Sequence, residues 1–200
     1  MKEDYPVIQG LFLTKQKNKI LHKISNIGDF KRVGNVFWKG EIHMDQIIKD
    51  VQNVERELQS ENTIVVGDFN INPYDASLIN ARYFHGIPIY EEAKRKSRII
   101  AGKEFYMFYN PMWNLLGDAQ EPYGTYYRSA ADTFNPYWHI YDQVIIRPSL
   151  RSRFVDGNLK IITGSANVSL LDKNKHPNHS ISDHLPITFE IKEDYHEQNT

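Results

Sequence analysis

Residues 63–73, TIVVGDFNINP, place an acid and an amide directly after a hydrophobic run. Residues two apart in a strand point to the same face, so Asp68 and Asn70 are predicted to project together while Phe69 turns to the core. A carboxylate and a carboxamide offer oxygen ligands to a hard cation such as Mg²⁺, or hydrogen bonds to a phosphate and its attacking water. Gly, Asp and Asn are also favoured turn residues, so an ordinary turn is the alternative.

Two later segments carry polar residues of the same kind. Residues 180–186, SISDHLP, place Asp183 and His184 just before the apolar stretch PITFEI, where a histidine can exchange a proton and an acid can hold a metal or a water. Residues 140–146, IYDQVII, set Asp142 in a hydrophobic strand, where a carboxylate is costly unless it is paired. A histidine that Asp142 orients would be a suitable partner. A polar loop and a structural salt bridge are the respective alternatives.

Hydrophobic periodicity predicts the elements that position these residues. Apolar residues from Met44 to Leu58 fall on one stripe, which predicts an amphipathic helix over about 43–59. Strands are predicted at 7–13, 18–24, 63–67, 139–146, 159–163 and 186–191, with a loop at 26–42 and an irregular, aromatic-rich stretch at 79–138.

Two local details complete this prediction. Asn72 and Pro73 are predicted to cap and open a short helix through Leu78. In the last strand the apolar residues Ile187, Phe189 and Ile191 are predicted to share one face, with Thr188 and Glu190 on the other. We therefore expect a single α/β domain over 1–192 with mostly antiparallel sheets, followed by a disordered tail at 193–200.

Composition excludes several classes of protein. The chain has 200 residues, 40% of them hydrophobic, and no cysteine, which excludes disulfides, thiolate catalysis and Cys-ligated zinc. The formal net charge is −1, so any contact with nucleic acid would depend on local basic patches such as EAKRKSR at 92–98. The sequence has no run of about 18 apolar residues and no signal-peptide pattern at its N-terminus, so we expect a cytoplasmic protein without a membrane span.

The ordered set VVGDFNINP, IYDQVII and SDHLPI resembles the C-terminal part of the DNase-I-like endonuclease/exonuclease/phosphatase superfamily. The segments FYNPMW, GTYYRS and DQVIIRP resemble a bacterial branch of that family, and the resemblance extends over about 18–192. It implies a four-layer αββα sandwich with mostly antiparallel sheets. It also implies a metal-dependent phosphoesterase of nuclease or phosphatase type, in which water attacks a phosphodiester or phosphomonoester in line.

The resemblance implies roles for individual residues. Asp68 and Asn70 resemble the pair that contacts the scissile phosphate and positions the attacking water. Asp183 resembles a metal-site acid, and Asp68 is the second candidate ligand for Mg²⁺ or Mn²⁺. His184 resembles the histidine that stabilises the phosphate or donates a proton to it, and Asp142 resembles the carboxylate that orients this histidine.

Three further site residues rest on looser matches. His22, in ILHKISN, resembles a second active-site histidine, although a lone strand histidine is often structural. Tyr126 and Arg128, in GTYYRS, are expected to bind the substrate. This substrate is expected to be a phosphate ester, and nucleic acid is one candidate.

The family pattern is incomplete in this sequence. Family members begin with a strand that bears an asparagine, and a later strand bears a glutamate that binds the catalytic metal. No such segments precede His22, and Glu3 and Asp4 lie in too polar a setting to replace that glutamate. We therefore expect the first strands of the fold to be lacking and Mg²⁺ to bind weakly. Uncovered sheet edges would then be protected by repacking, by a homo-oligomer or by a partner.

Two alternative functions follow from the same residues. The lacking glutamate favours a non-catalytic member of the fold that acts as a binding or self-assembling module. A zinc site formed by His176, His179 and His184 is less favoured, because the HPNH spacing lies in a polar loop without a helix to align the ligands.

Overall fold

The computed structural model describes residues 10–13, 37–165 and 167–192. Within these ranges the helices are α1 (Phe37–Leu58), α2 (Ala76–Ile79) and α3 (Tyr90–Ala93), with 3₁₀ helices at Pro111–Leu115, Pro148–Arg153 and Asp156–Asn158. The strands are β1 (Gly10–Leu13), β2 (Thr63–Asp68), β3 (Gly86–Ile87), β4 (Ser97–Ile100), β5 (Lys103–Tyr106), β6 (Phe108–Tyr109), β7 (Tyr126–Tyr127), β8 (Trp138–His139), β9 (Asp142–Ile146), β10 (Lys160–Ile161), β11 (Gly164–Ser165), β12 (Val168–Ser169) and β13 (Ile187–Thr188). Among the strand pairs of the described ranges, only β3 and β6 run parallel. The protein is therefore mixed α/β with mostly antiparallel sheets, as the sequence predicts.

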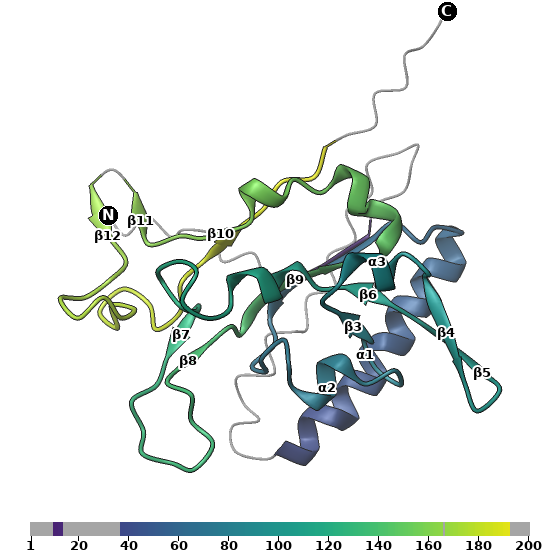
Figure 1. The fold of residues 1–200 in the computed structure, drawn as a ribbon, viewed down its shortest axis with the longest axis horizontal. Coiled ribbons are helices and arrows are strands. Elements are labelled where there is room, and N and C mark those ends of the chain that lie inside the picture. Colours follow the sequence, from purple (N-terminus) through teal and green to yellow (C-terminus); the bar gives the residue numbers. More distant parts are fainter. Residues whose placement is uncertain (1–9, 14–36, 166, 193–200) are drawn as a thin grey trace, which may run out of the picture.

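A five-stranded sheet in the order β1-β2-β9-β6-β3 forms the centre of the molecule (Figure 1). All six residues of β2 are buried, so both faces of this strand are covered. Strands β2 and β9 are antiparallel, with Ile64 opposite Ile146 at one end and Asp68 opposite Asp142 at the other. The hydrophobic residues of the two strands thus hold the two aspartates side by side at one edge of the core.

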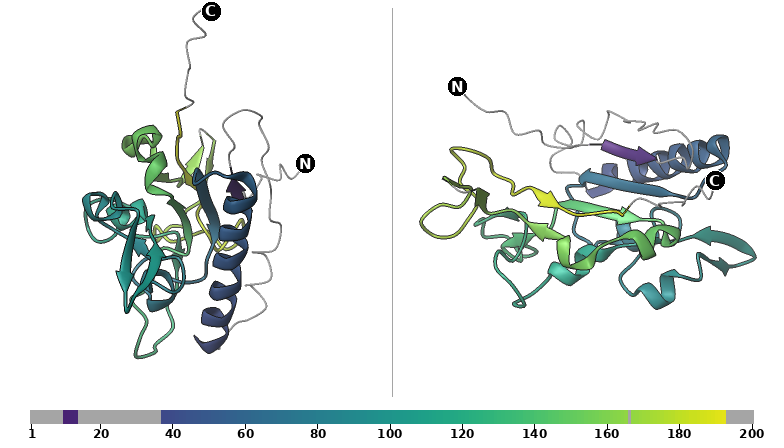
Figure 2. Two further views of the ribbon diagram at one scale, coloured as in Figure 1. Left: turned by 90° about the vertical axis from the view of Figure 1, so that its right-hand side faces the viewer. Right: turned by 90° about the horizontal axis from the view of Figure 1, so that it is seen from above.

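Helix α1 covers one face of this sheet. Its residues Met44, Ile48 and Val51 are buried in one cluster with Val65 of β2 and Ile145 of β9. Figure 2 shows the helix lying along the sheet. The apolar stripe predicted from the sequence is confirmed. Its contact with the sheet accounts for the burial of Val65 and Ile145 on this face.

The helix begins at Phe37, earlier than the predicted start at 43. The sequence favoured a loop there because Gly40 and the glycines before it interrupt the periodicity. One glycine inside a helix costs only about 1 kcal/mol, so a long helix that is anchored by later residues tolerates Gly40.

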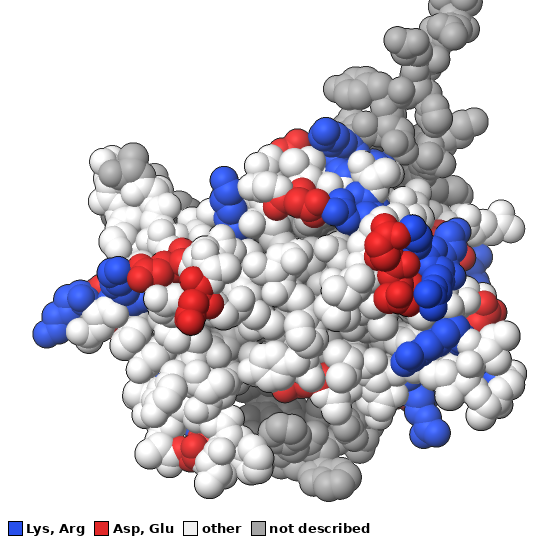
Figure 3. All heavy atoms as spheres, viewed as in Figure 1, with Lys and Arg blue, Asp and Glu red and all other residues white. Residues whose placement is uncertain are grey.

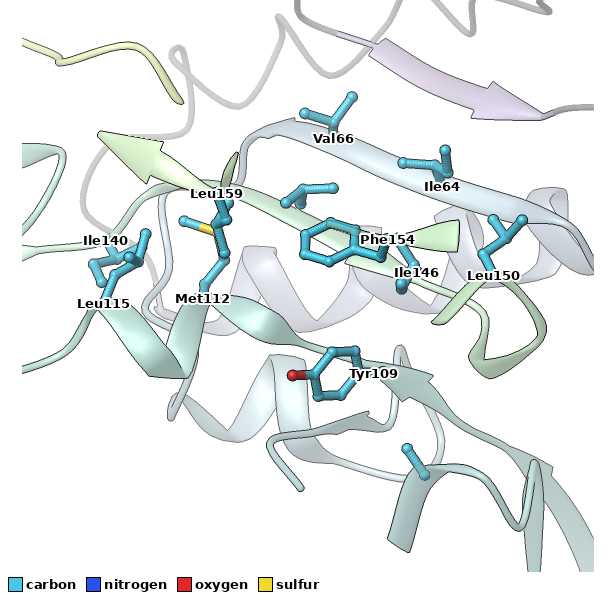
Figure 4. Packing of buried hydrophobic residues seen from close by; sticks show 12 residues of the cluster. Ile64, Val66, Tyr109, Met112, Leu115, Ile140, Ile146, Leu150, Phe154 and Leu159 are labelled. Carbon is cyan, nitrogen blue, oxygen red and sulfur yellow. The ribbon is translucent and has the colours of Figure 1, made fainter. Parts of the chain in front are cut away.

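A second hydrophobic cluster covers the opposite face of the sheet (Figure 4). Ile64, Val66 and Ile146 alternate with the residues that face α1. They pack with Phe154 and Leu159, each of which directly follows one of the 3₁₀ helices beyond β9. The described part of the chain thus forms three layers: α1, the five-stranded sheet, and a layer that contains the 3₁₀ segments and the β10–β13 pair (Figure 2).

The C-terminal strand has the two faces that its sequence predicts. Ile187, Phe189 and Ile191 pack against this second cluster, whereas Thr188 and Glu190 are exposed. Strand β13 itself is shorter than the predicted 186–191, and β10 is likewise shorter than 159–163.

The strand predicted at 139–146 is divided into β8 and β9. Between them the backbone amide of Ile140 donates to Oδ1 of Asn72 at 3.0 Å, and the amides of Tyr141 and Asp142 both donate to Oγ1 of Thr125 at 3.1 Å. These amides are therefore occupied by side chains in place of a neighbouring strand, which is why the ladder is interrupted here.

The predicted helix cap at Asn72 is wrong. The short helix α2 begins at Ala76 with Asp75 at the capping position, and the side chain of Asn72 contacts the chain between β8 and β9. Asp75 accepts the backbone amide of Asn72 at 2.7 Å, which closes the turn that precedes the helix. A sequence motif for a helix cap does not tell whether the asparagine side chain accepts a backbone amide of the next helix or one of a distant segment, here that of Ile140.

Four predicted segments lie wholly or partly outside the described residues: the strands at 7–13 and 18–24, the loop at 26–42 and the tail at 193–200. Of the first, β1 is described and pairs antiparallel with β2. None of the described helices has both the length and the apolar character needed to cross a bilayer.

Candidate functional site

Two aspartates lie opposite each other where β2 ends and β9 begins. Asp68 and Asp142 are cross-strand partners, and Asp68 is buried with 6% of its surface exposed. Buried hydrophobic residues further along β2 and β9 fix the register of this pair, because a shift by one residue would turn the core side chains outward. The sheet therefore determines the distance between these acids, as a rigid support for a site requires.

A histidine far along the chain completes the group. Nδ1 of His184 lies 2.7 Å from Oδ2 of Asp142. The loop that carries this histidine is held by the bridge between Tyr126 and His184, and by the amide of the buried Leu185, which donates to the carbonyl of Thr125 at 2.7 Å. The ring centroids of His184 and Tyr126 are 4.9 Å apart, so β7 also supports the imidazole from the side.

The surroundings of His184 favour its charged form. Burial lowers the pKa of this histidine because the imidazolium loses hydration, but the hydrogen bond and negative charge of Asp142 outweigh burial. Asp68 and Asp183 add smaller contributions in the same direction, and the net result is a pKa raised above the usual 6.5. His184 thus holds a proton more readily than a free histidine does.

Asp68, Asp142 and His184 form a group whose ligand atoms all lie within 4.8 Å of one another. Two carboxylates and an imidazole in this arrangement can hold a divalent cation or move a proton. The predicted metal ligand Asp183 is not part of this group; it is half-buried beside His184 and acts on it through its charge. The structure brings the predicted site residues Asp68 and Asp142 together with His184.

Asn70 lies just beyond this group. Strand β2 ends at Asp68, and Asn70 has a left-handed backbone with φ 51° and an exposed side chain. Its backbone amide donates to Oδ1 of Asp68 at 3.0 Å, so the segment after the strand is a turn around the aspartate. Strand alternation therefore does not extend from Asp68 to Asn70, although Phe69 does enter the core as predicted.

Of the two predicted substrate-binding residues, Tyr126 lies directly at the group. Its ring stacks with that of Tyr141 at 5.3 Å, in addition to the contact with His184. Arg128 is exposed and pairs with Asp132 at 3.1 Å, and its positive charge helps to lower the pKa of His139. Arg128 therefore lies at the rim of this region, where its side chain is available to solvent.

Thr125 holds the site together but was not predicted from the sequence. Its Oγ1 accepts hydrogen bonds from the backbone amides of Tyr141 and Asp142, and its carbonyl accepts one from the backbone amide of Leu185. The preceding Gly124 is required for this approach, since a Cβ there would lie 2.5 Å from the carbonyl oxygen of His139. The segment GTYYRS, which stands out in the sequence, contains both residues.

The sequence also did not predict a network of hydrogen bonds around the buried His139. Nδ1 of His139 lies 3.1 Å from Nδ2 of Asn72, and Nε2 lies 3.2 Å from Oδ1 of Asn135. Because an amide nitrogen only donates and an amide oxygen only accepts, the neutral histidine protonated on Nε2 satisfies both contacts. Nδ2 of Asn135 in turn donates to the carbonyl of Arg128 at 3.0 Å. The network thus connects the turn after β2 to the loop between β7 and β8.

This environment keeps His139 neutral. Burial lowers its pKa, the charge of Arg128 lowers it further, and Asp132 opposes both with a smaller effect. The neighbouring Tyr141 is similarly affected, and burial, with the charge of Asp75, raises its pKa to about 12. The ring of His139 therefore packs and hydrogen-bonds as a neutral group, and the neutral ring of Tyr141 packs against its aromatic neighbours.

The remaining expectations concern other histidines. His22 lies outside the described residues. His176 stacks on Tyr127 with ring centroids 3.5 Å apart, and neither it nor His179 belongs to the group of candidate metal ligands found in the described part of the chain. The geometry of these residues therefore gives no support to a zinc site made of three histidines.

A hollow of about 670 Å³ lies away from this group, between α1 and the β4–β5 hairpin, and is lined by residues such as Glu55, Lys96 and Arg147. It contains none of the three clustered residues. We assign the candidate site to the Asp68, Asp142 and His184 group, because volume alone supplies no reactive groups.

Comparisons with protein-family models, curated proteins and solved structures give no match, so function is inferred from this geometry.

Proposed function

We propose that the chain is a metal-dependent phosphoesterase that hydrolyses a phosphodiester or phosphomonoester by in-line attack of water. The pairing of His184 with Asp142, 2.7 Å apart beside the buried Asp68, is the observation that supports this proposal most strongly. Three residues from distant parts of the sequence meet at one end of the central sheet, and each has the chemistry that phosphate-ester hydrolysis needs.

His184 would act on the phosphate. Its Nδ1 faces Asp142, so Nε2, on the other side of the ring, would face the substrate. Because its pKa is raised above 6.5, His184 holds a proton to a higher pH than a free histidine does, and it could donate that proton to a phosphate oxygen or to the leaving group. Asp142 would orient the ring and stabilise its charged form.

Asp68 and Asp142 fit a hard divalent cation, since both supply carboxylate oxygens within one small group. Asp68 and Asp142 would hold Mg²⁺ or Mn²⁺, with Asp183 as the further acid predicted from the sequence. When bound, the cation would neutralise charge on the phosphate. With two to three acids and no further ligand assigned, we expect weak binding.

Asn70 and Tyr126 would border the bound phosphate. Asn70 lies two residues after Asp68 and is exposed, and its carboxamide could donate a hydrogen bond to a phosphate oxygen. Tyr126 packs on the ring of His184, and its hydroxyl could hydrogen-bond to a phosphate oxygen. Arg128 would meet the more distant part of an anionic substrate.

We also propose that the fold is of the DNase-I-like sandwich type. The α1 layer, the five-stranded sheet and the layer with β10 and β13 would correspond to three of its four layers. The mostly antiparallel strand pairing and the place of the group at a sheet end support this proposal.

Hydrolysis of a chromogenic phosphodiester and of the matched monoester tests the proposal. We expect turnover with Mg²⁺ or Mn²⁺ and none with chelator. Asp68→Asn keeps an acceptor for the amide of Asn70 but removes the charge, and we expect it to lose most of the turnover, while Asp118→Asn in an exposed loop should not. Turnover that persists in chelator would refute the metal requirement, and the absence of turnover with either ion would refute the hydrolase.

A further inference from the structure

The β4–β5 hairpin projects from the end of the molecule opposite β11 and β12 (Figure 1). Its strands pair from Ser97 opposite Tyr106 to Ile100 opposite Lys103. The two residues of the turn, Ala101 and Gly102, both have positive φ, at 49° and 77°. This is the type I′ geometry that suits the twist of a two-residue hairpin, so the projecting tip has a defined shape.

The base of the hairpin is tied to the core. The amide of Met107 donates to the carbonyl of Lys96 at 2.7 Å, and Nη1 of Arg147 donates to the carbonyl of Met107 at 3.0 Å. Arg147 is itself buried in a bidentate pair with Glu55 of α1, with both distances 2.8 Å. The tip is therefore held out from a rigid support.

The tip exposes large aliphatic side chains. Ile99 is 75% exposed and Ile100 is 41% exposed, directly before the turn. An exposed turn needs no apolar residue for its own stability, and two adjacent isoleucines at a projecting tip leave apolar surface in water. Such a tip gains free energy when it enters an apolar environment.

Two cations lie beside this apolar tip. Arg98 and Lys103 lie on the hairpin face that also carries Ile100, and both are exposed. Neither forms an ion pair with any described residue; Lys103 instead lies over the ring of Phe105 at 5.5 Å. The one acid of the hairpin strands, Glu104, accepts hydrogen bonds from Ser97 and Tyr106. Figure 3 shows blue side chains next to the white tip on the right of the view.

We propose that the β4–β5 hairpin docks the protein on an anionic lipid surface. Ile99 and Ile100 would enter the boundary between headgroups and acyl chains, while Arg98 and Lys103 meet the lipid phosphates. An apolar tip distinguishes this surface from one that binds nucleic acid, where phosphate contacts and base stacking dominate. A second copy of the chain is a poor occupant, because the same cations would face each other.

This inference does not depend on the proposed hydrolase. The hairpin base adjoins Arg147, which follows β9, whereas Asp142 begins that strand. The hairpin and the candidate site thus lie at opposite ends of the same strand, and a docked molecule would keep its site open to the solvent.

Flotation with lipid vesicles tests the proposal. We expect the protein to float with phosphatidylcholine vesicles that contain phosphatidylglycerol and not with phosphatidylcholine alone, and to bind less at about 0.3 M salt than at about 0.05 M. Ile99→Asp should abolish binding, and Arg98→Gln or Lys103→Gln should each weaken it about fivefold. Val168→Asp, at an exposed aliphatic residue of the β11–β12 hairpin at the other end of the molecule, is the matched control and should bind normally.

Three results would overturn the proposal. The first is the absence of flotation with anionic vesicles under both salt conditions. The second is binding that Ile99→Asp and Ile100→Asp leave unchanged, provided that their circular dichroism matches the wild type. The third is a protein that ignores vesicles but binds a labelled oligonucleotide, or dimerises by light scattering, in a manner lost in Ile99→Asp.

Discussion

Nδ1 of His184 lies 2.7 Å from Oδ2 of Asp142, although the two residues are 42 positions apart in the sequence. Both are largely buried, with 16% and 15% of their side chains exposed. At this depth water screens the pair less than it would at the surface, so the carboxylate has a strong influence on the imidazole. The pair is therefore the part of the site whose chemistry can be tested most directly.

We predict that Asp142→Asn lowers the pKa of His184. In the folded protein this pKa is raised above the unfolded value of 6.5, so the pair contributes stability below pH 6.5 that is lost as the pH rises through the folded pKa. In Asp142→Asn this contribution should disappear. NMR titration of the histidine rings measures the shift, and an unchanged titration of His184 would contradict the assigned pair.

We predict the opposite pH dependence for His139. Its folded pKa lies below 6.5, so its stabilising contribution is complete above pH 6.5 and is lost as the pH falls toward the folded pKa. His85, which is also buried with a lowered pKa, acts in the same direction. Urea denaturation between about pH 5 and pH 8 should show a decline on acidification that is smaller in His139→Gln, because glutamine does not titrate. An equal decline in the variant would contradict this role.

Removal of Glu55 should destabilise the protein strongly. Glu55 and Arg147 form a buried bidentate pair with side-chain exposures of 11% and 5%, so Glu55→Ala leaves a buried guanidinium without its counter-charge. We expect a loss of about 3–5 kcal/mol in the free energy of unfolding. Lys49→Ala breaks the exposed pair with Asp45 and should cost less than about 1 kcal/mol. Similar costs for the two variants would show that burial does not matter here.

Gly124→Ala should also be destabilising. The added Cβ would lie 2.5 Å from the backbone oxygen of His139, which cannot move without disturbing the pairing of β7 with β8. We expect a cost of about 1–3 kcal/mol in the free energy of unfolding. Gly157→Ala meets nothing within 4 Å and serves as the control. Thermal melts of the two variants compare them, and a normal melt for Gly124→Ala would argue against the close approach.

Much of the sheet could be predicted from the sequence. The apolar runs around Asp68 and Asp142 identify buried strands, and an acid at the end of such a strand needs a partner. The helical stripe from Met44 to Leu58 is equally clear. The meeting of the two aspartates depends on strand order and register, which no local pattern determines.

The supporting residues could not be predicted in the same way. Asn72 has the sequence context of a helix cap, yet its oxygen accepts the amide of Ile140. His139 and Thr125 act through contacts with chain segments that are distant in sequence, and their residue types carry no spacing rule. Such residues become recognisable only when the fold brings the segments together.

The most direct test of the proposed hydrolase compares turnover of a chromogenic phosphodiester by wild type, His184→Ala and His179→Ala in Mg²⁺ or Mn²⁺. His179 is exposed in the same loop region and controls for local disturbance, with circular dichroism to confirm folding. We predict that His184→Ala loses about 10²–10⁴ in rate while His179→Ala retains the wild-type rate. An unchanged rate in a folded His184→Ala variant would contradict the assignment of this histidine and, with it, the proposed mechanism.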